Sequence, residues 1–468
     1  MATMGATFDV VVLGAGSGGY ACALRAAELG LSVALIEKDK VGGTCLHRGC
    51  IPTKALLHAA EVADTARDGG MFGIHATIDK IDLSEVTSYA DSVVSRLFTG
   101  LTGLVSSRGI TVIKGAGRLV SRSEGVLVAV GDQTYAGRRV VLATGSYPRS
   151  LPGLTIDQSQ VVNSEHALRV ATLPSSVIVL GGGVIGVEFA SAWRSFGVDV
   201  TIVEALPRLL PGEEPEISKA LERAFAKRKV RIATGSQMES LERSERGVRL
   251  TLSGGKAVEA DLLLVAVGRG PATDGMGYDE AGVARQAGFV TVDERMETTV
   301  PGVYAVGDIV VGPQLAHRGF AHGIFVAEEI AHRLGAADKA PVPVVDQHLP
   351  RVAYCEPQVA SVGLTEAAAR EQLGAVETFT LDLAGNGKSQ ILKTRGFVKL
   401  VRQGDGPVVG ISTIGARVGE LIAEAQLITS WEAFASDGSG LIHPHPTQSE
   451  ALGEAHLTLA GKPLHVHG

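Results

Sequence analysis

The chain has 468 residues, of which 59 are glycine and only 18 are proline; glycine is well above its usual share of about 7 %, without the proline of a low-complexity linker. Apolar residues make up 45 % of the sequence, which excludes a disordered chain and is consistent with roughly three domains. The net charge of −7 argues against nucleic acid or an anionic membrane as the main partner.

The N-terminal segment has no signal-peptide pattern, because residues 1–9 contain neither a basic region nor a long apolar run. The charge-free stretch 170–187 contains proline and several glycines, which is not typical of a membrane span. We therefore expect a soluble cytoplasmic protein.

The first strong pattern runs from Phe8 to Glu37. Residues 10–13 predict a buried strand, the glycines of 14–19 a turn, residues 20–30 a helix and residues 31–36 a second strand that closes at Glu37. In such a motif, Gly14 makes the turn, Gly16 lets a pyrophosphate approach, and Gly19 lets helix and strand pack. The acid at the end of the second strand accepts hydrogen bonds from a ribose.

The same motif occurs a second time, 167 residues further on. Residues 177–204 match residues 10–37 without gaps at ten of 28 positions. The matches include Gly181, Gly183 and Gly186, and an acid, Glu204, again closes the second strand. Two such copies predict two dinucleotide-binding domains, although glycine turns without a ligand are the alternative.

Later segments complete the predicted domain order. Residues 140–145, 262–268 and 303–308 predict strands, and residues 397–401 and 408–414 predict two more before a helix over 420–434. We expect an α/β protein with two Rossmann-like domains and a C-terminal α+β domain. The predicted boundaries are 1–150 for the first segment of one dinucleotide domain, 151–272 for the other, 273–343 for the segment that completes the first, and 344–468 for the last domain.

Two of the four cysteines are close in sequence. Cys45 and Cys50 are separated by four residues, and Pro52 is placed where a helix could begin. A thiolate at Cys50 would then be stabilised by the helix N-terminus. This favours a redox pair, with a metal site and inert thiols as alternatives; C-x4-C is not a common zinc spacing, and we expect no metal.

The tail contains His443-Pro-His445-Pro-Thr-Gln-Ser-Glu450. A carboxylate five residues after a histidine could fix its tautomer and raise its basicity if the turn brings the two together. Thiol–disulfide exchange needs such a base, because only the thiolate attacks. A proline-stiffened surface loop with incidental histidines is the alternative.

Together these motifs resemble the flavoprotein disulfide reductase family over essentially the whole chain. The motifs GxGxxG, GGTCLxxGCIPTK, ATGSxP, GGGVIGVE, VGRGP, VYAVGD and HPHPTxSE occur here in that order. The resemblance implies FAD in the first glycine-turn domain, a nicotinamide nucleotide in the second, and a homodimer in which the tail histidine reaches the other subunit's cysteines. It also implies oxidation of dihydrolipoamide carried by the acyltransferase of 2-oxo acid dehydrogenase complexes.

The resemblance assigns roles by position. Cys50 would face the flavin, Cys45 would exchange disulfides with the substrate, His445 would be the base oriented by Glu450, and Lys54 with Glu188 would form a charged pair that tunes the flavin. The residues implied for FAD are Gly14, Gly16, Gly19, Glu37, Lys38, Gly43, Thr44, Lys54, Gly117, Thr144, Gly145, Ser146, Asp308 and Ala316. Those implied for the nicotinamide nucleotide are Gly181, Gly183, Val184, Ile185, Gly186, Glu204 and Gly268.

The acid of the second repeat favours NAD over NADP. A carboxylate at Glu204 accepts from a ribose hydroxyl and repels a 2′-phosphate; Arg208 is the one dissonant residue, which we expect at the surface or beside the pyrophosphate. Glutathione- or mycothiol-type reductases and a quinone reductase remain alternatives. A non-catalytic scaffold is disfavoured, since Cys45, Cys50, His445 and Glu450 are all present.

Overall fold

A computed structural model describes residues 3–122 and 125–465. The chain divides into two compact units. One comprises Met1–Ala55, Glu85–Arg149 and Arg269–Asp346, and the other comprises Leu56–Ser84, Ser150–Gly268 and Gln347–Gly468. Each unit contains one copy of the predicted glycine-turn motif.

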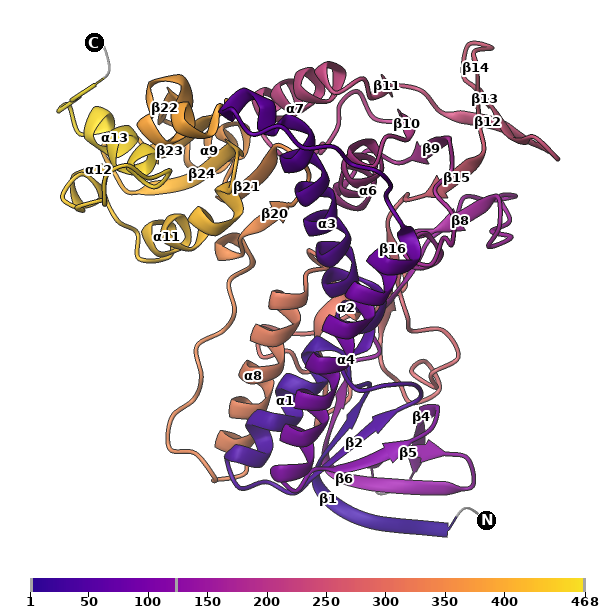
Figure 1. Cartoon of the computed structure of the whole chain (residues 1–468). Helices are drawn as coiled ribbons and strands as arrows, with labels where there is room; N and C mark the ends of the chain where they lie inside the picture. The colour runs from indigo at the N-terminus through magenta and orange to yellow at the C-terminus, as the bar shows by residue number, and fades with distance from the viewer. Residues whose placement is uncertain (1–2, 123–124, 466–468) are drawn as a thin grey trace. The chain divides into compact units, whose positions relative to one another are not determined.

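The first unit is built on a mostly parallel sheet (Figure 1). Its order is β3-β2-β1-β6-β5-β4, and β19 also pairs with β6. Residues 10–12 of β1 are completely buried, which explains their unbroken apolar run, because a central parallel strand is covered on both faces. The strands are β1 (Thr3–Leu13), β2 (Val33–Glu37), β3 (Thr111–Lys114), β4 (Gly117–Arg122), β5 (Gly125–Val130), β6 (Gln133–Leu142) and β19 (Val303–Ala305).

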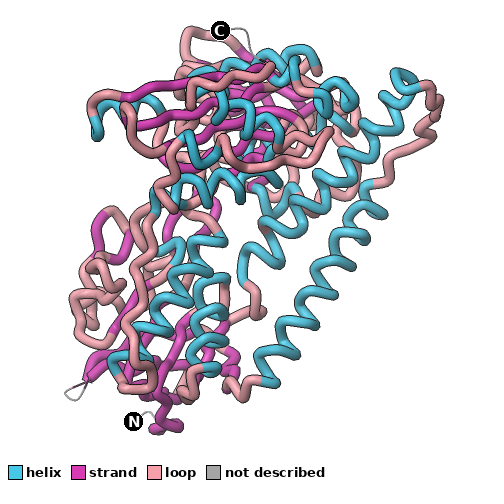
Figure 2. Tube along the Cα trace, turned by 90° about the vertical axis from the view of Figure 1, so that its left-hand side faces the viewer, coloured by secondary structure: helices cyan, strands magenta, loops and turns pink. Residues whose placement is uncertain are grey.

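Two helices of this unit pack through glycines. Helix α1 (Ser17–Glu28) lies beside α8 (Ala316–Arg333) in Figure 1, and Figure 2 shows the helices of the chain in cyan from a second direction. A Cβ built at Gly323 would lie 2.2 Å from the carbonyl oxygen of Gly18, so only glycine allows this approach. The other helices that begin in this unit or lie mostly in it are α2 (Gly43–Arg48), α3 (Cys50–Asp68) and α4 (Leu83–Ser107).

The segments that follow the predicted strands over 140–145 and 262–268 pair with each other. Residues after β6 form β7 (Ser146–Pro148), which runs antiparallel to β16 (Arg269–Pro271). The segment after β16 carries β17 (Arg285–Gln286) and β18 (Phe289–Val290) and leads to β19 and the short helix η2 (Gly307–Ile309). Two motifs far apart in sequence, ATGSxP and VGRGP, are thus joined by a two-stranded sheet.

The second unit contains the other parallel sheet, in the order β11-β10-β9-β15-β8. A three-stranded antiparallel sheet, β12-β13-β14, is inserted before β15. The elements are β8 (Val161–Asn163), α5 (Ser164–Ala167), β9 (Ser176–Leu180), α6 (Val184–Ser195), β10 (Asp199–Val203), α7 (Pro215–Lys227), β11 (Arg231–Ala233), β12 (Met238–Ser244), β13 (Gly247–Leu252), β14 (Ala257–Ala260) and β15 (Leu262–Val265).

The C-terminal part of this unit is an antiparallel sheet, β20-β21-β24-β23-β22, covered by helices. The predicted helix over 420–434 is wrong at its end, because α11 stops at Ser430. Glu432 has a positive φ of 52°, and the backbone of Phe434 bridges to Pro407 instead. The elements are β20 (Arg351–Ala353), β21 (Gln358–Gly363), α9 (Glu366–Leu373), β22 (Val376–Asp382), α10 (Gly387–Leu392), β23 (Phe397–Gln403), β24 (Val408–Gly415), α11 (Val418–Ser430), α12 (Ala435–Gly438) and α13 (Glu450–Leu459).

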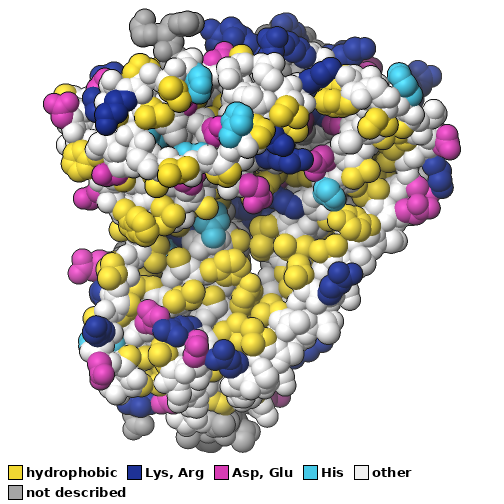
Figure 3. Space-filling model, turned by 60° about the vertical axis from the view of Figure 1, so that its left-hand side comes forward, with side chains coloured by type: hydrophobic (Ala, Val, Ile, Leu, Met, Phe, Trp, Pro, Cys, Tyr) yellow, Lys and Arg dark blue, Asp and Glu magenta, His cyan; other side chains and the backbone are white. Residues whose placement is uncertain are grey.

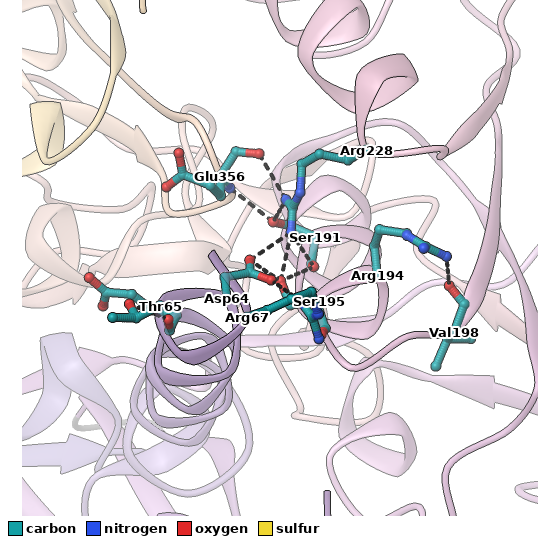
Figure 4. A network of polar contacts seen from close by, with 10 residues as sticks. Asp64, Thr65, Arg67, Ser191, Arg194, Ser195, Val198, Arg228 and Glu356 are labelled. Atoms are coloured by element: carbon teal, nitrogen blue, oxygen red, sulfur yellow. Dashed lines mark hydrogen bonds and ion pairs between the residues drawn. The ribbon is translucent and has the colours of Figure 1, made fainter. Parts of the chain in front are cut away.

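A polar network ties α6 to the segment before β21 (Figure 4). The guanidinium of Arg228 donates to the hydroxyls of Ser191 and Ser195, at 2.9 and 2.6 Å, and to the backbone carbonyl of Glu356 at 2.9 Å. Asp64, near the end of α3, accepts from the same guanidinium at 3.0 Å. This network fixes the helix that follows the second glycine turn.

No helix within residues 3–122 and 125–465 is long and apolar enough to cross a membrane.

Candidate active site and nucleotide sites

The two cysteines lie on consecutive helices of the first unit. Cys45 is in α2 and Cys50 is the first residue of α3, two residues earlier than the expected helix start at Pro52, which is accommodated in the first turn. Both are thiols in the structure. A hydrogen bond with the Cys50 thiol, and burial, raise the pKa of Cys45, while the positive charge of Lys54 acts in the opposite direction. The two sulfurs are therefore close enough to interact.

A tyrosine that the sequence analysis did not single out belongs to this region. Tyr20 is in the second turn of α1, directly after the first glycine turn, and its ring packs against that of Phe320 with centroids 5.5 Å apart. Burial raises its pKa to about 12, and the two cysteines contribute in the same direction. The phenol therefore keeps its proton near neutral pH, beside the pair.

The first glycine turn has the geometry of a dinucleotide loop. Gly14 has φ of +101°, and a Cβ at Gly19 would lie 1.8 Å from the Gly14 carbonyl oxygen, whereas a Cβ at Gly16 would meet nothing within 4 Å. The two positions that require glycine for the fold, Gly14 and Gly19, are thus distinct from Gly16, where the space is open. The space at Gly16, next to the N-terminus of α1, fits an approaching phosphate.

The acid at the end of β2 is held by the turn itself. One carboxylate oxygen of Glu37 accepts from the Ala15 N–H at 2.7 Å and the other from the Asp39 N–H at 2.8 Å. Burial raises the pKa of this carboxyl group, and the Ala15 N–H acts in the opposite direction. Lys38 follows at the surface, and a Cβ at Gly43 would lie 2.6 Å from the Gly16 Cα, so the start of α2, with Gly43 and Thr44, lies against the turn.

The paired strands β7 and β16 bring together the next group of residues expected at the FAD site. The Ser146 hydroxyl donates to Asp308 at 2.5 Å and accepts from Arg269 at 2.7 Å. The Thr144 hydroxyl is hydrogen-bonded to the Tyr278 hydroxyl at 3.0 Å. Gly145, which stands between Thr144 and Ser146 in the chain, has a φ of +75°. Arg269 and Tyr278 were not among the expected site residues, although Arg269 lies within the VGRGP motif.

A buried histidine contacts the backbone next to Asp308. The Nδ1 atom of His322 in α8 accepts from the Gly307 N–H at 3.4 Å, and its Nε2 atom is 4.0 Å from Asp346. Burial lowers the pKa of His322 to about 4, so the ring is neutral near pH 7. No sequence motif pointed to this residue; only the packing of α8 shows that it supports the turn.

The remaining positions expected for FAD are in the same unit. Gly117 begins β4, and a Cβ there would lie 2.6 Å from Leu13 Cδ1, which explains the glycine. Ala316 is the first residue of the 18-residue helix α8. All expected FAD residues therefore belong to one compact unit.

The second glycine turn repeats the first in detail. A Cβ at Gly186 would lie 1.9 Å from the Gly181 carbonyl oxygen, and a Cβ at Gly183 would meet nothing within 4 Å. Glu204 accepts from the N–H groups of Gly182 and Leu206, at 2.5 and 2.7 Å. The two copies therefore share the open position and the tethered acid.

The other expected nucleotide residues border this turn. Val184 and Ile185 form the first turn of α6, and Gly268 has φ of +107° with open space at its Cβ position. Arg208 is the one nearby cation that did not fit the predicted preference for NAD. Its Nη2 atom donates to the carbonyl oxygens of Pro211 and Glu213, at 2.7 and 3.2 Å. Its guanidinium is engaged by the backbone of its own loop.

The structure brings His445 and Glu450 together. His445 Nδ1 is 2.7 Å from Glu450 Oε1, and the other carboxylate oxygen accepts from the Thr447 N–H at 2.6 Å. Hydrogen bonds from Thr447 and His445 lower the pKa of Glu450 and outweigh the opposing effect of burial. The His445 side chain is 77 % exposed, so its Nε2 edge is accessible.

Glu188 is almost completely buried in α6, where its carboxylate accepts from the Tyr354 N–H at 3.0 Å. Lys54 is in the first turns of α3 and belongs to the other unit, as do both cysteines. Among the described residues, no group of three or more metal-binding side chains is assembled.

Comparisons with known proteins agree with this organisation. Residues 8–323 match the model of the pyridine nucleotide-disulphide oxidoreductases, and residues 349–456 match the dimerisation domain of the same proteins. The chain is 37 % identical to dihydrolipoyl dehydrogenase of Bacillus subtilis, over 99 % of this chain and 100 % of that protein.

Two solved structures share the fold and low identity. Mycobacterium tuberculosis LpdA has a TM-score of 0.89 at 27 % identity, with 96 % of this chain and 99 % of that chain covered. The flavoprotein disulfide reductase RclA of Escherichia coli, solved as a Cu(II) complex, has a TM-score of 0.83 at 28 % identity, with 97 % and 100 % covered.

Proposed function

The chain belongs to the pyridine nucleotide-disulphide oxidoreductase family, and we propose that it is an enzyme that oxidises dihydrolipoamide to lipoamide with NAD as the electron acceptor. The observation that carries this proposal is the thiol pair Cys45–Cys50, in a chain that aligns with the full length of a dihydrolipoyl dehydrogenase. The predicted disulfide reductase resemblance and the family membership agree.

In the proposed mechanism, His445 acts as the base, and Cys45 and Cys50 carry out the disulfide exchange. With the His445 Nδ1–H donated to Glu450, the lone pair is on Nε2, which takes the proton of one dihydrolipoamide thiol. The thiolate attacks Cys45 Sγ in the oxidised disulfide, the Cys45–Cys50 bond breaks, and Cys50 leaves as a thiolate. The second substrate thiol, once deprotonated, attacks the substrate sulfur of the mixed disulfide and releases lipoamide and Cys45.

The glycine turns would hold the two cofactors. The open positions at Gly16 and Gly183 fit two dinucleotides, FAD in the first turn and NAD in the second. FAD, when bound, would supply the two-electron chemistry between the dithiol and the nicotinamide. Glu37 and Glu204 would orient the ribose hydroxyls, and Ser146 would orient Asp308 towards the ribityl chain. The tuning role of Lys54 and Glu188 stays a prediction.

Dimerisation is part of the proposal. The match to the dimerisation domain supports a homodimer, and we propose that His445 of one copy serves the cysteines of the other. The substrate would arrive on the lipoyl arm of the acyltransferase in a 2-oxo acid dehydrogenase complex, as the resemblance of the motifs to the flavoprotein disulfide reductases implies.

A steady-state assay tests the function. The purified enzyme is given dihydrolipoamide, reduced glutathione or reduced mycothiol with NAD or NADP, and the reverse reactions are run with the disulfides. We expect dihydrolipoamide with NAD to give the highest kcat/KM. A preference for glutathione or mycothiol would identify the alternative reductase and refute lipoamide as the substrate.

The variant Cys50→Ser tests the relay. We expect it to lose dihydrolipoamide oxidation while still retaining a yellow chromophore, since Cys50 is not among the residues expected to bind the nucleotide of FAD. Dihydrolipoamide kinetics like those of the unmodified enzyme would show that the pair does not carry the electrons.

A further inference from the structure

The ring of His445 is not held by packing. Its side chain is 77 % exposed. The only direction-setting contact on the ring in the described chain is Glu450, and Glu450 is itself fixed by the Thr447 N–H. The direction of Nε2 therefore depends on the main chain of residues 446–448.

That main chain is seated on α10. The Asn386 side-chain amide donates to the Thr447 carbonyl oxygen at 3.0 Å. The same side chain accepts from the Ser389 N–H at 2.9 Å and so caps α10. A Cβ at Gly387 would lie 3.9 Å from His445 Cε1, so the start of α10 lies beside the ring.

A second contact is buried beneath the turn. The Ser389 hydroxyl, which is completely buried, donates to Gln448 Oε1 at 2.7 Å. The Gln448 amide nitrogen donates in turn to the Ala416 carbonyl oxygen, at the end of β24, at 2.9 Å. One side chain thus links the turn both to α10 and to the central sheet of the domain.

We propose that Asn386, Ser389 and Gln448 are positioning residues for His445, which hold the 446–448 main chain so that Nε2 points to the substrate thiol. This inference rests on the proposed function and adds residues outside its expected site. Such a role is chemically sensible, because displacing a base by about 1 Å can cost on the order of 100-fold in rate.

If Gln448 and Ser389 had only a structural role, a variant that regains stability would also regain kcat. Truncating Gln448 alone leaves the buried Ser389 hydroxyl without its acceptor, which lowers the thermal stability of the protein. Replacing both partners by apolar residues of similar shape removes that penalty. The link from the turn to Ala416 is absent in both cases, so stability and positioning can be separated.

The experiment compares Gln448→Met, Ser389→Ala and the double variant with Gln358→Met. Gln358 is the matched control, since its Oε1 accepts from the Gly419 N–H of α11 at 3.0 Å and it has no part in the turn. Each protein is assayed for dihydrolipoamide oxidation with NAD, for NADH-dependent quinone reduction, which does not need His445, and for thermal stability.

We expect Gln448→Met to lower kcat for dihydrolipoamide about tenfold or more, with KM and quinone reduction changed less than about twofold. The double variant should regain thermal stability but not kcat, and Gln358→Met should keep kcat. A kcat of Gln448→Met within about twofold of the unmodified enzyme, or recovery of kcat in the double variant, would overturn the inference. An unmodified enzyme that does not oxidise dihydrolipoamide would instead refute the proposed function.

Discussion

At the scale of single residues, the proposed preference for NAD depends on the carboxylate of Glu204. Its two oxygens accept from the Gly182 and Leu206 N–H groups, so the charge is fixed at the end of β10 and cannot turn away from a ligand. A 2′-phosphate placed there would meet a fixed negative charge. The neighbouring cation does not offset it, since Arg208 is engaged by its own loop.

We therefore expect Glu204→Ala to narrow the preference for NAD over NADP by about tenfold or more, because one repulsive charge is removed. The ratio of kcat/KM for the two nucleotides measures the effect. Glu239→Ala, at an exposed position of β12, removes the same charge elsewhere and should leave the ratio unchanged. An unaltered ratio in Glu204→Ala would show that the ribose contact is misplaced.

His322 makes a prediction about acid stability. Its pKa is lowered to about 4 by burial, with Arg318 acting in the same direction and Asp346 against it. In the unfolded chain the group titrates near 6.5, so below that pH the unfolded state binds a proton that the folded state excludes until about pH 4. Stability contributed by the neutral ring is therefore lost as pH falls from about 6.5 to about 4, by up to about 3 kcal/mol.

The variant His322→Gln tests this. A glutamine oxygen can still accept from the Gly307 N–H but does not titrate, so the loss of unfolding free energy between pH 6.5 and 4.5 should be smaller than in the unmodified protein. Denaturant unfolding across that range measures it. Two parallel curves for His322→Gln and the unmodified protein would contradict the assignment.

At the scale of elements, the two glycine turns separate folding from binding. In the second turn, a Cβ at Gly186 would collide with the Gly181 carbonyl oxygen at 1.9 Å, while a Cβ at Gly183 would enter open space. We expect Gly186→Ala to lower the thermal stability of the protein strongly. Gly183→Ala should leave stability unchanged and weaken NAD binding about tenfold or more, because the added methyl occupies the phosphate position.

Thermal unfolding and titration with NAD measure the two effects, and each variant is the control for the other. If Gly183→Ala bound NAD normally, the open space at this turn would not be the pyrophosphate site.

The same turns show what could be predicted from sequence. Strand, glycine turn, helix and acid followed from local patterns, because Gly19 and Gly186 are required by the carbonyl oxygens of Gly14 and Gly181, five residues earlier in each turn. The end of α11 did not follow, since Phe434 is drawn into a backbone bridge with the distant Pro407. His322, Tyr278 and Ser389 gave no signal either; their roles arise from contacts with a backbone N–H 15 residues away and with side chains 134 and 59 residues away in the chain, respectively.

At the scale of the whole molecule, the exposed apolar surface indicates association between copies. Hydrophobic side chains gather in patches on the face shown in Figure 3. Within the range that matches the dimerisation domain, Trp431 is 76 % and Ile442 is 96 % exposed. Contiguous apolar patches, rather than single exposed side chains, are typical of interfaces, and Ile442 is three residues from His445.

If the active site is shared between two copies, weakening the dimer should remove one activity and spare another. We expect Ile442→Glu to shift the protein towards the monomer, because association would bury an unpaired charge at the interface. Dihydrolipoamide oxidation should then fall and become dependent on enzyme concentration, while NADH-dependent quinone reduction, in which the proposed mechanism gives His445 no part, should persist. Light scattering and both assays over a dilution series measure this.

Val342→Glu, at a position that is 85 % exposed and outside the matched dimerisation range, adds the same charge and should change neither property. A monomeric Ile442→Glu enzyme that oxidises dihydrolipoamide at the full rate would show that each copy carries a complete site, and the exchange of His445 between copies would have to be abandoned.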